Sequence, residues 1–176
     1  NILENIDAAI ICSPTSLHTE QARLLSQNKI NLLIEKPVCI DLNGIQDLMK
    51  SIKENNLVAM TAYIFRYTES LDKIKSLLSS NSIGKVLYYR GEFSEFLPDW
   101  HPYEDYRKFY MAEKKLGGGS ILDQCHIIDL AHYLCGNFKS VMAFNSKISN
   151  LEINADDIAE MIIQLENNII CSIHTD

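Results

Sequence analysis

The feature that most constrains the fold is the alternation of short apolar runs with amphipathic segments over the first third of the chain. The runs at residues 8–12 and 30–34 lack regular polar alternation, which is typical of parallel strands covered on both faces. Between them, Ser and Thr residues can cap a helix that reaches residue 27. One apolar stripe predicts a second helix over 45–52, and a third strand follows over 57–63. This β-α-β-α-β order predicts half of a doubly wound sheet.

After Tyr63 the pattern changes to mixed helices and strands. We predict an amphipathic helix over 71–78 and a strand over 85–93. The stretch 94–116 is rich in aromatic and charged residues and has no clear period. Three glycines then open a helix that we expect to run from residue 117 to residue 134.

The last segment predicts a β-hairpin. Apolar residues alternate over 159–165 and again over 169–173, and Asn167-Asn168 between them suits a tight turn because Asn tolerates positive φ. Two strands are not stable alone, so they predict a larger, mainly antiparallel open sheet. We therefore expect an α/β part with a partial parallel sheet, followed by an α+β part, with the boundary near Ile64. The predicted parts are residues 1–63 and 64–176.

Composition excludes several classes of partner. The net charge is −7 with scattered basic residues, which disfavours a nucleic-acid or anionic-membrane surface. No apolar run approaches the roughly 20 residues that span a bilayer. The five cysteines form no CxxC pair, so we interpret them as reduced thiols of a cytoplasmic protein. The histidines at 101, 132 and 174 have no partner at ligand spacing, and we expect no metal site.

Glu35-Lys36-Pro37 is the first candidate for chemistry. The tripeptide ends a predicted parallel strand, where open α/β sheets bind ligands. Pro fixes the turn, and a partly desolvated Lys beside Glu35 suits proton transfer or hydrogen bonding to a substrate hydroxyl. On the tripeptide alone, an ordinary surface Lys after a strand is the better interpretation.

The second candidate is the segment that begins at Gly117-Gly118-Gly119. Glycines allow the backbone to approach another group closely before the helix begins. Asp123 and His126 are three residues apart, so they would share a helix face and could titrate as a pair. A neutral His beside a carboxylate is a common general base. The alternative, polar residues on a solvent-exposed helix face, is equally consistent with this segment alone.

Taken together, the ordered segments resemble one family. Residues 7–18, Glu35-Lys36-Pro37, 66–74, Ile83-Gly84-Lys85 and the triple-glycine helix occur in the order found in the glucose-fructose oxidoreductase / inositol dehydrogenase (Gfo/Idh/MocA) family. The resemblance covers essentially the whole chain and implies a Rossmann-like nucleotide-binding domain followed by a large antiparallel sheet domain. The loop at 99–107 with Asp123-Gln124-Cys125-His126 most resembles a branch from bacterial surface-sugar biosynthesis.

The resemblance also implies roles for individual residues. Lys36 corresponds to the active-site lysine, His126 to the histidine that handles the hydroxyl proton, and Asp123 to the aspartate that orients this pair. Positions that border the cofactor are Pro14, Thr15, His18 and Glu35, together with Lys36. Positions expected to contact substrate are Arg66, Trp100, Tyr106 and Arg107. Aromatic rings would stack on the sugar, and an Arg fork would hold a carboxylate or phosphate.

One departure concerns the spacing of Asp123 and His126. The common family pattern places the His four positions after the Asp, whereas here the spacing is three. One residue fewer rotates the His by about 100° around a continuous helix. The favoured branch shares the shorter spacing and can use the His in a different way. The role of His126 as a base therefore follows less directly from the resemblance than the role of Lys36 does.

The resemblance implies an oxidoreductase that transfers hydride between NAD or NADP and a carbinol carbon of a sugar or nucleotide sugar. The sequence contains no GxGxxG turn after its first strand. Its only glycine cluster, Gly117–Gly119, lies far downstream and follows a loop. We therefore expect a fragment that lacks the N-terminal glycine-rich unit and the C-terminal strands, and that binds cofactor poorly by itself. The alternative function is a sugar-binding or assembly module without activity. We also expect a homo-oligomer formed through the open sheet.

Overall fold

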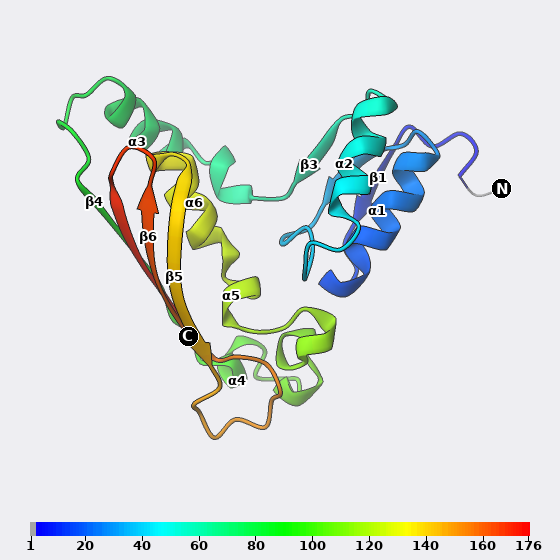
Figure 1. Ribbon diagram of the computed structural model, residues 1–176. Coiled ribbons are helices and arrows are strands. Elements are labelled where there is room, and N and C mark those ends of the chain that lie inside the picture. Colours follow the sequence, from blue (N-terminus) through cyan, green and yellow to red (C-terminus); the bar gives the residue numbers. More distant parts are fainter. Residues whose placement is uncertain (1–2) are drawn as a thin grey trace. The chain divides into compact units, whose positions relative to one another are not determined.

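The computed structural model describes residues 3–176, so the first two residues of the predicted nucleotide-binding part lie outside it. The described chain forms two compact units (Figure 1). The first unit runs to Ala62 and includes Lys115–Gly117. The second unit comprises Tyr63–Lys114 and Gly118–Asp176.

The first unit is built on three parallel strands in the order β1-β2-β3. Its elements are β1 (Ala8–Ile11), η1 (Thr15–Leu17), α1 (His18–Gln27), β2 (Asn31–Ile34), α2 (Ile45–Glu54) and β3 (Ala59–Thr61). The predicted β-α-β-α-β order is confirmed. The parallel register pairs Ile11 with Ile34 and Ile34 with Thr61, so the carboxyl ends of the three strands lie along one edge.

Only one face of this sheet is covered within the first unit. Helices α1 and α2 pack against each other, and the core beneath them contains Ile11, Ala22, Leu32, Ile34 and Leu48. On the opposite face, Ile10 is 69% exposed and Met60 is 42% exposed. Both crossovers run in the same direction along the sheet, and right-handed crossovers of this kind place their helices on the same face. The prediction of strands covered on both faces is therefore wrong for residues 3–62.

The second unit begins with helical turns and ends in a four-stranded sheet. Its helical elements are η2 (Ile64–Tyr67), α3 (Glu69–Ser79), α4 (Leu97–Trp100), η3 (Tyr106–Lys108), η4 (Tyr110–Ala112), α5 (Ser120–Asp123) and α6 (Cys125–Cys135). A further turn, η5 (Lys114–Leu116), lies where the chain passes between the two units. The strands of the second unit are β4 (Tyr88–Phe93), β5 (Phe138–Ser146), β6 (Ile158–Leu165) and β7 (Ile170–Thr175). The irregular stretch predicted for 94–116 is thus a series of short helical turns.

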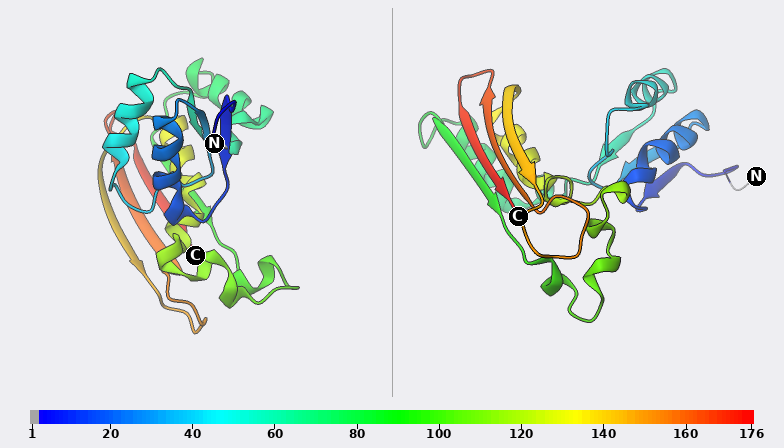
Figure 2. Two further views of the ribbon diagram at one scale, coloured as in Figure 1. Left: turned by 90° about the vertical axis from the view of Figure 1, so that its right-hand side faces the viewer. Right: turned by 60° about the horizontal axis from the view of Figure 1, so that its bottom comes forward.

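The sheet has the order β4-β7-β6-β5. Its β5-β6 and β6-β7 pairs are antiparallel and its β4-β7 pair is parallel, so the predicted, mainly antiparallel sheet is confirmed. The β6-β7 hairpin turns at Asn168, whose φ is 65°, as the sequence predicts. Alternate residues of β6 and β7 pack against α6 to form the main core: Ile127, Ala131, Cys135, Met161, Ile163, Leu165, Cys171 and Ile173. Figure 2 shows α6 along one face of the strands and the long β5-β6 loop at their end.

Candidate functional site

Glu35, Lys36 and Pro37 follow β2 directly in the first unit. The backbone N–H of Glu35 donates to the carbonyl of Ile11 at 2.9 Å, which continues the parallel ladder by one residue. The backbone N–H of Lys36 then donates to Glu35 Oε2 at 3.2 Å. Lys36 is half-buried and lies at the carboxyl edge of the middle strand. Side chains at such edges are well placed to contact a bound ligand.

His18 joins the loops that follow β1 and β2. Its side chain is only 1% exposed. Nδ1 lies 2.8 Å from the carbonyl oxygen of Pro37, and Nε2 lies 2.8 Å from the carbonyl oxygen of Ser13. His18 is therefore neither a helix-surface residue nor an exposed ligand contact. It fixes the loop that carries Lys36, and any contribution to cofactor binding would pass through that loop.

Thr15 lies beneath this edge, while Pro14 is exposed beside it. Thr15 is 3% exposed, and it packs against Gly117 in the same unit. A Cβ at Gly117 would come within 2.5 Å of Thr15 Cβ, and the φ of Gly117 is +93°, so only glycine is free of strain here.

The other two glycines of the triplet belong to the second unit. A Cβ at Gly118 would overlap the carbonyl of Met111, and a Cβ at Gly119 would reach 2.5 Å from Asp156 Oδ1. The backbone N–H of Gly119 donates to the Met111 carbonyl at 3.1 Å. The glycines therefore allow the close backbone approach that the sequence suggests, and they place the start of α5 beside Asp156.

The helix after the glycines is not continuous. Gln124, with φ −90° and ψ 20°, separates α5 from α6, so the prediction of one helix to Leu134 is wrong. Asp123 ends α5 and is buried at 6% exposure. Its carboxylate accepts hydrogen bonds from Tyr110 Oη at 2.7 Å and from Gln124 Nε2 at 3.3 Å. Asp123 and His126 therefore do not share one helix face as predicted, because the two residues lie on different helices.

His126 lies in the first turn of α6, among aromatic rings from the start of the second unit. Its ring centroid is 5.9 Å from that of Tyr63, edge-on, and 4.7 Å from that of Phe65, tilted. Burial, followed by the proximity of Cys125 and Asp129, raises the pKa of Tyr63 well above its ordinary value. Tyr63 therefore stays a neutral phenol beside the imidazole.

Arg66 and Asp129 connect these aromatic residues to α6. Arg66 donates from Nε to Asp129 Oδ2 at 2.8 Å and from Nη2 to Asp129 Oδ1. The hydrogen bond to Asp129 raises the pKa of Arg66. The guanidinium lies over the rings of Tyr133, at 4.9 Å, and Tyr63, at 5.5 Å. The predicted substrate contact, Arg66, is thus engaged in a bidentate pair that holds the η2 turn against α6.

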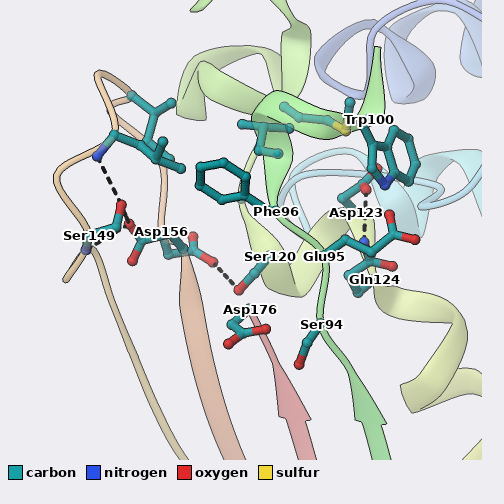
Figure 3. Close-up of a pocket in the computed structure, with 16 residues that line it drawn as sticks. Ser94, Glu95, Phe96, Trp100, Ser120, Asp123, Gln124, Ser149, Asp156 and Asp176 are labelled. Carbon is teal, nitrogen blue, oxygen red and sulfur yellow. Dashed lines mark hydrogen bonds between the residues drawn. The ribbon is translucent and has the colours of Figure 1, made fainter. Parts of the chain in front are cut away.

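A cavity of about 380 Å³ opens beside α5, entirely within the second unit (Figure 3). It brings together two of the predicted site residues, Asp123 and Trp100. One part of its wall is apolar and consists of Phe96, Leu97, Trp100, Met111, Leu151 and Ile153. The other part is acidic and consists of Glu95, Asp123, Asp156, Asp157 and Asp176. Such a volume is within the range of roughly 300–1,000 Å³ usual for small-molecule sites.

The remaining predicted contacts, Tyr106 and Arg107, are not among the residues that line this cavity. Arg107 donates to Asp105 Oδ1 at 2.8 Å and to Glu152 Oε2 at 2.9 Å. Tyr106 Oη accepts from the backbone N–H of Glu152 at 3.3 Å. Both residues therefore fasten the 105–108 turn to the β5-β6 loop.

Sequence reasoning missed the residues that hold these side chains in place: Tyr63, Phe65, Tyr110, Asp156 and Asp157. Tyr63 ends a predicted strand, and the others come from segments with no helical or strand period. The one available signal was Asp156-Asp157 directly before a predicted strand.

Within residues 3–176, no group of three or more His, Cys, Asp or Glu side chains is arranged to hold a metal ion. Over the same range, every helix is too short or too polar to cross a membrane.

Comparison with family models gives two matches that together span most of the chain. Residues 1–63 match the oxidoreductase family, NAD-binding Rossmann fold. Residues 71–176 match the GFO/IDH/MocA C-terminal domain.

Individual relatives agree with this result. The levoglucosan dehydrogenase of Pseudarthrobacter phenanthrenivorans is 28% identical over 79% of this chain and 35% of its own length. The myo-inositol 2-dehydrogenase of Thermotoga maritima is 26% identical over 92% of this chain and 46% of its own length. The chain thus spans between a third and a half of each of these two relatives.

Solved structures show the same fold. A levoglucosan dehydrogenase in complex with NADH and levoglucosan superposes with a TM-score of 0.87 at 25% identity, over 98% of this chain and 49% of the other. The WlbA dehydrogenase of Bordetella pertussis superposes with a TM-score of 0.84 at 21% identity, over 98% of this chain and 49% of the other.

Proposed function

Because the chain belongs to the Gfo/Idh/MocA family of NAD-dependent oxidoreductases, we propose that its protein transfers hydride between NAD or NADP and a carbinol carbon of a sugar or nucleotide sugar. The observation that carries the proposal is the position of Lys36, directly after the middle strand of the segment that matches the NAD-binding model. The two relatives named for levoglucosan and myo-inositol support a polyhydroxylated substrate.

The first unit suits the part of the cofactor that lies at the carboxyl edge of a parallel sheet. His18 fixes the Ser13 and Pro37 loops, which leaves Pro14 exposed and Glu35 half-buried at that edge. When bound, the nicotinamide ring supplies the group that accepts or gives the hydride. A GxGxxG turn for the pyrophosphate is absent from the 176 residues, so this chain supplies only part of a dinucleotide site.

In this proposal, Lys36 donates a hydrogen bond to the substrate hydroxyl and stabilises the developing alkoxide. His126 takes the hydroxyl proton, or returns it in the reverse direction. Asp123, fixed by Tyr110 and Gln124, helps to orient the substrate. Of the residues expected to contact substrate, Trp100 has the most direct support because it borders the cavity. The other three expected contacts would need to give up their present partners before they could bind substrate: Arg66, Tyr106 and Arg107.

The cysteines and the open sheet bear on where the protein is located and how it assembles. We propose a cytoplasmic protein, for which reduced thiols such as Cys135 and Cys171, packed in the core, are typical. We propose self-association through the uncovered face of the four-stranded sheet, where Met142, Phe144 and Ile162 are at least half exposed. We expect neither nucleic acid nor a membrane among the partners.

The test uses protein expressed from the complete gene, so that any residues beyond these 176 are included. The substrates are levoglucosan and myo-inositol, and nicotinamide reduction is followed by absorbance. Lys36→Ala should lower kcat/KM at least about 100-fold, because general acid–base groups contribute roughly 10²–10⁴-fold. The matched control is Lys53→Ala, an exposed Lys on α2, which should keep the wild-type rate.

Circular dichroism should show the same fold in both variants. Wild-type kcat/KM in Lys36→Ala would overturn the proposal. Titration of NADH with the protein expressed from the complete gene separates the alternative, since a sugar-binding or assembly module gives no saturable fluorescence change with the cofactor.

A further inference from the structure

The cavity of the second unit has an unusual charge pattern. All of its ionisable lining side chains are carboxylates, and none of its lining residues is Lys, Arg or His. The carboxylates come from four separate segments: Glu95 follows β4, Asp123 ends α5, Asp156 and Asp157 precede β6, and Asp176 follows β7. The acidic wall is therefore a property of the folded cavity and not of one acidic run.

Hydrogen bonds keep part of this wall in a fixed orientation. Asp156 accepts from Ser120 Oγ and from the backbone N–H of Ile121, both at 3.4 Å. Asp157 accepts from the backbone N–H of Ile148 at 2.7 Å and from that of Ser149 at 3.1 Å. Burial alone would raise the pKa of Asp157, but the hydrogen bond from the Ser149 hydroxyl, the two backbone donors and the charge of Lys147 outweigh it and lower the pKa below its ordinary value. Asp157 is therefore an anion at neutral pH.

The arginine that the sequence assigned to an anionic group has other partners. Arg107, expected from the sequence to bind a carboxylate or phosphate, is paired with Asp105 and Glu152. Two carboxylates share its single charge, and its side chain is 50% exposed outside the cavity. His174 Nε2 lies 3.4 Å from Asp176 Oδ2, and Lys147 helps to lower the pKa of Asp157, but neither residue lines the cavity. An anionic ligand in the cavity would thus meet several carboxylates and no lining cation.

The apolar part of the wall suits a ring with an apolar face. Phe96 and Trp100 border the cavity beside the acidic side chains, as Figure 3 shows. The C–H face of a sugar ring can pack on these rings while its hydroxyl groups donate to carboxylate oxygens. A wall that only accepts hydrogen bonds is complementary to a ligand that can donate them.

We propose that this cavity binds an uncharged sugar or polyol ring and discriminates against sugars that carry a carboxylate or phosphate group. The inference rests on the proposed function and deepens it, because it chooses between the simple sugar and the nucleotide sugar as the group that occupies this cavity.

The test is a fluorescence titration, because Trp100 is the only tryptophan of the chain and lines the cavity. The three probes are methyl glucoside, the corresponding methyl glucuronoside, which adds one carboxylate, and glucosamine, which adds an ammonium group. We expect saturable changes with methyl glucoside and glucosamine. The glucuronoside should bind at least 10-fold more weakly than methyl glucoside.

Glu95→Lys places a cation at the mouth of the cavity. Glu95 is exposed and lies between β4 and α4, outside both elements, so the variant should fold normally. It should reduce the preference for methyl glucoside over the glucuronoside at least threefold. Glu104→Lys makes the same charge change at an exposed position outside the lining and should leave the preference unchanged.

Equal affinity for the glucoside and the glucuronoside would overturn the inference, and so would the absence of a fluorescence change with all three probes. An unchanged preference in Glu95→Lys would overturn it as well. The proposed function fails by a different result, namely the absence of nicotinamide reduction by the complete protein with any sugar. The two failures are therefore distinguishable.

Discussion

The two units hold their candidate residues by different means. In the first unit, Lys36 follows a strand and its loop is fixed by His18, whose ring nitrogens face two backbone carbonyls. In the second unit, His126 and Asp123 lie among side chains from distant segments, including Arg66, which pairs with Asp129. Backbone groups are present at every position, whereas a side-chain partner depends on one residue type. The second arrangement should therefore be more sensitive to substitution.

The strongest test of this difference is Asp129→Ala. It leaves the Arg66 guanidinium, 32% exposed, without the carboxylate that is 8% exposed in the present pair. Breaking a fully buried pair costs roughly 3–5 kcal/mol, and the partial exposure of Arg66 reduces this to about 2–3 kcal/mol of unfolding free energy. Urea denaturation would measure the loss.

The imidazole signals of His126 should shift in the same variant, because the η2 turn that carries Phe65 loses its connection to α6. Asp72→Ala, at an exposed position of α3, is the control. It should change neither the free energy of unfolding nor the His126 signals. Unchanged His126 signals in Asp129→Ala would show that the ion pair does not position this ring.

The corresponding test in the first unit is His18→Ala. It removes both contacts to the carbonyls of Ser13 and Pro37, and a buried polar group without a partner costs roughly 1–3 kcal/mol. We expect a loss of about 2 kcal/mol, measured by urea denaturation. Amide exchange should become faster in the 35–39 loop while β2 stays protected. Glu20→Ala, exposed on the same helix, serves as the control. A uniform increase in the amide exchange rate over the whole first unit in His18→Ala would mean that His18 stabilises the core and not the loop.

The smallest effect concerns a side-chain pair at the surface of the second unit. Burial alone would lower the pKa of His174, but the hydrogen bonds to Glu160 and Asp176 outweigh it and raise the pKa. A raised pKa in the folded state gives stabilisation that is complete below the unfolded value of about 6.5. The stabilisation is lost as the pH rises through the folded pKa.

Glu160→Gln should therefore flatten the dependence of stability on pH between about 5.5 and 8. Because Glu160 is 57% exposed, the change should stay below about 1 kcal/mol. Thermal unfolding at several pH values would measure it, with Glu104→Gln as a control. A larger effect would place this surface pair on a level with the Arg66–Asp129 pair.

The same difference explains which features could be predicted from the sequence. The β-α-β-α-β order and the turn at Asn168 depend on local patterns, and both are confirmed. Strand β5 was not predicted, since nearly all of its residues are exposed and its sequence carries no burial alternation. The break at Gln124 was missed because the flanking residues favour helix on both sides.

Site residues follow the same rule. The position of Lys36 after a strand could be predicted because it depends only on local sequence. The partners of Asp123 and Arg66 could not, since Tyr110 is 13 residues from Asp123 and Asp129 is 63 residues from Arg66. No periodicity connects residues at such separations, and only the folded chain brings them together.

The interruption at Gln124 also changes how residue spacing should be compared among relatives. On a continuous helix, each added or removed residue would rotate every later side chain by about 100°. Here α5 has four residues and ends before α6 begins, so the orientation of α6 is set by its own packing on the sheet. The junction thus uncouples the numbering of Asp123 from the direction in which His126 points. Two enzymes whose Asp-to-His spacings differ by one residue can present these groups in the same way, provided that each contains such a break.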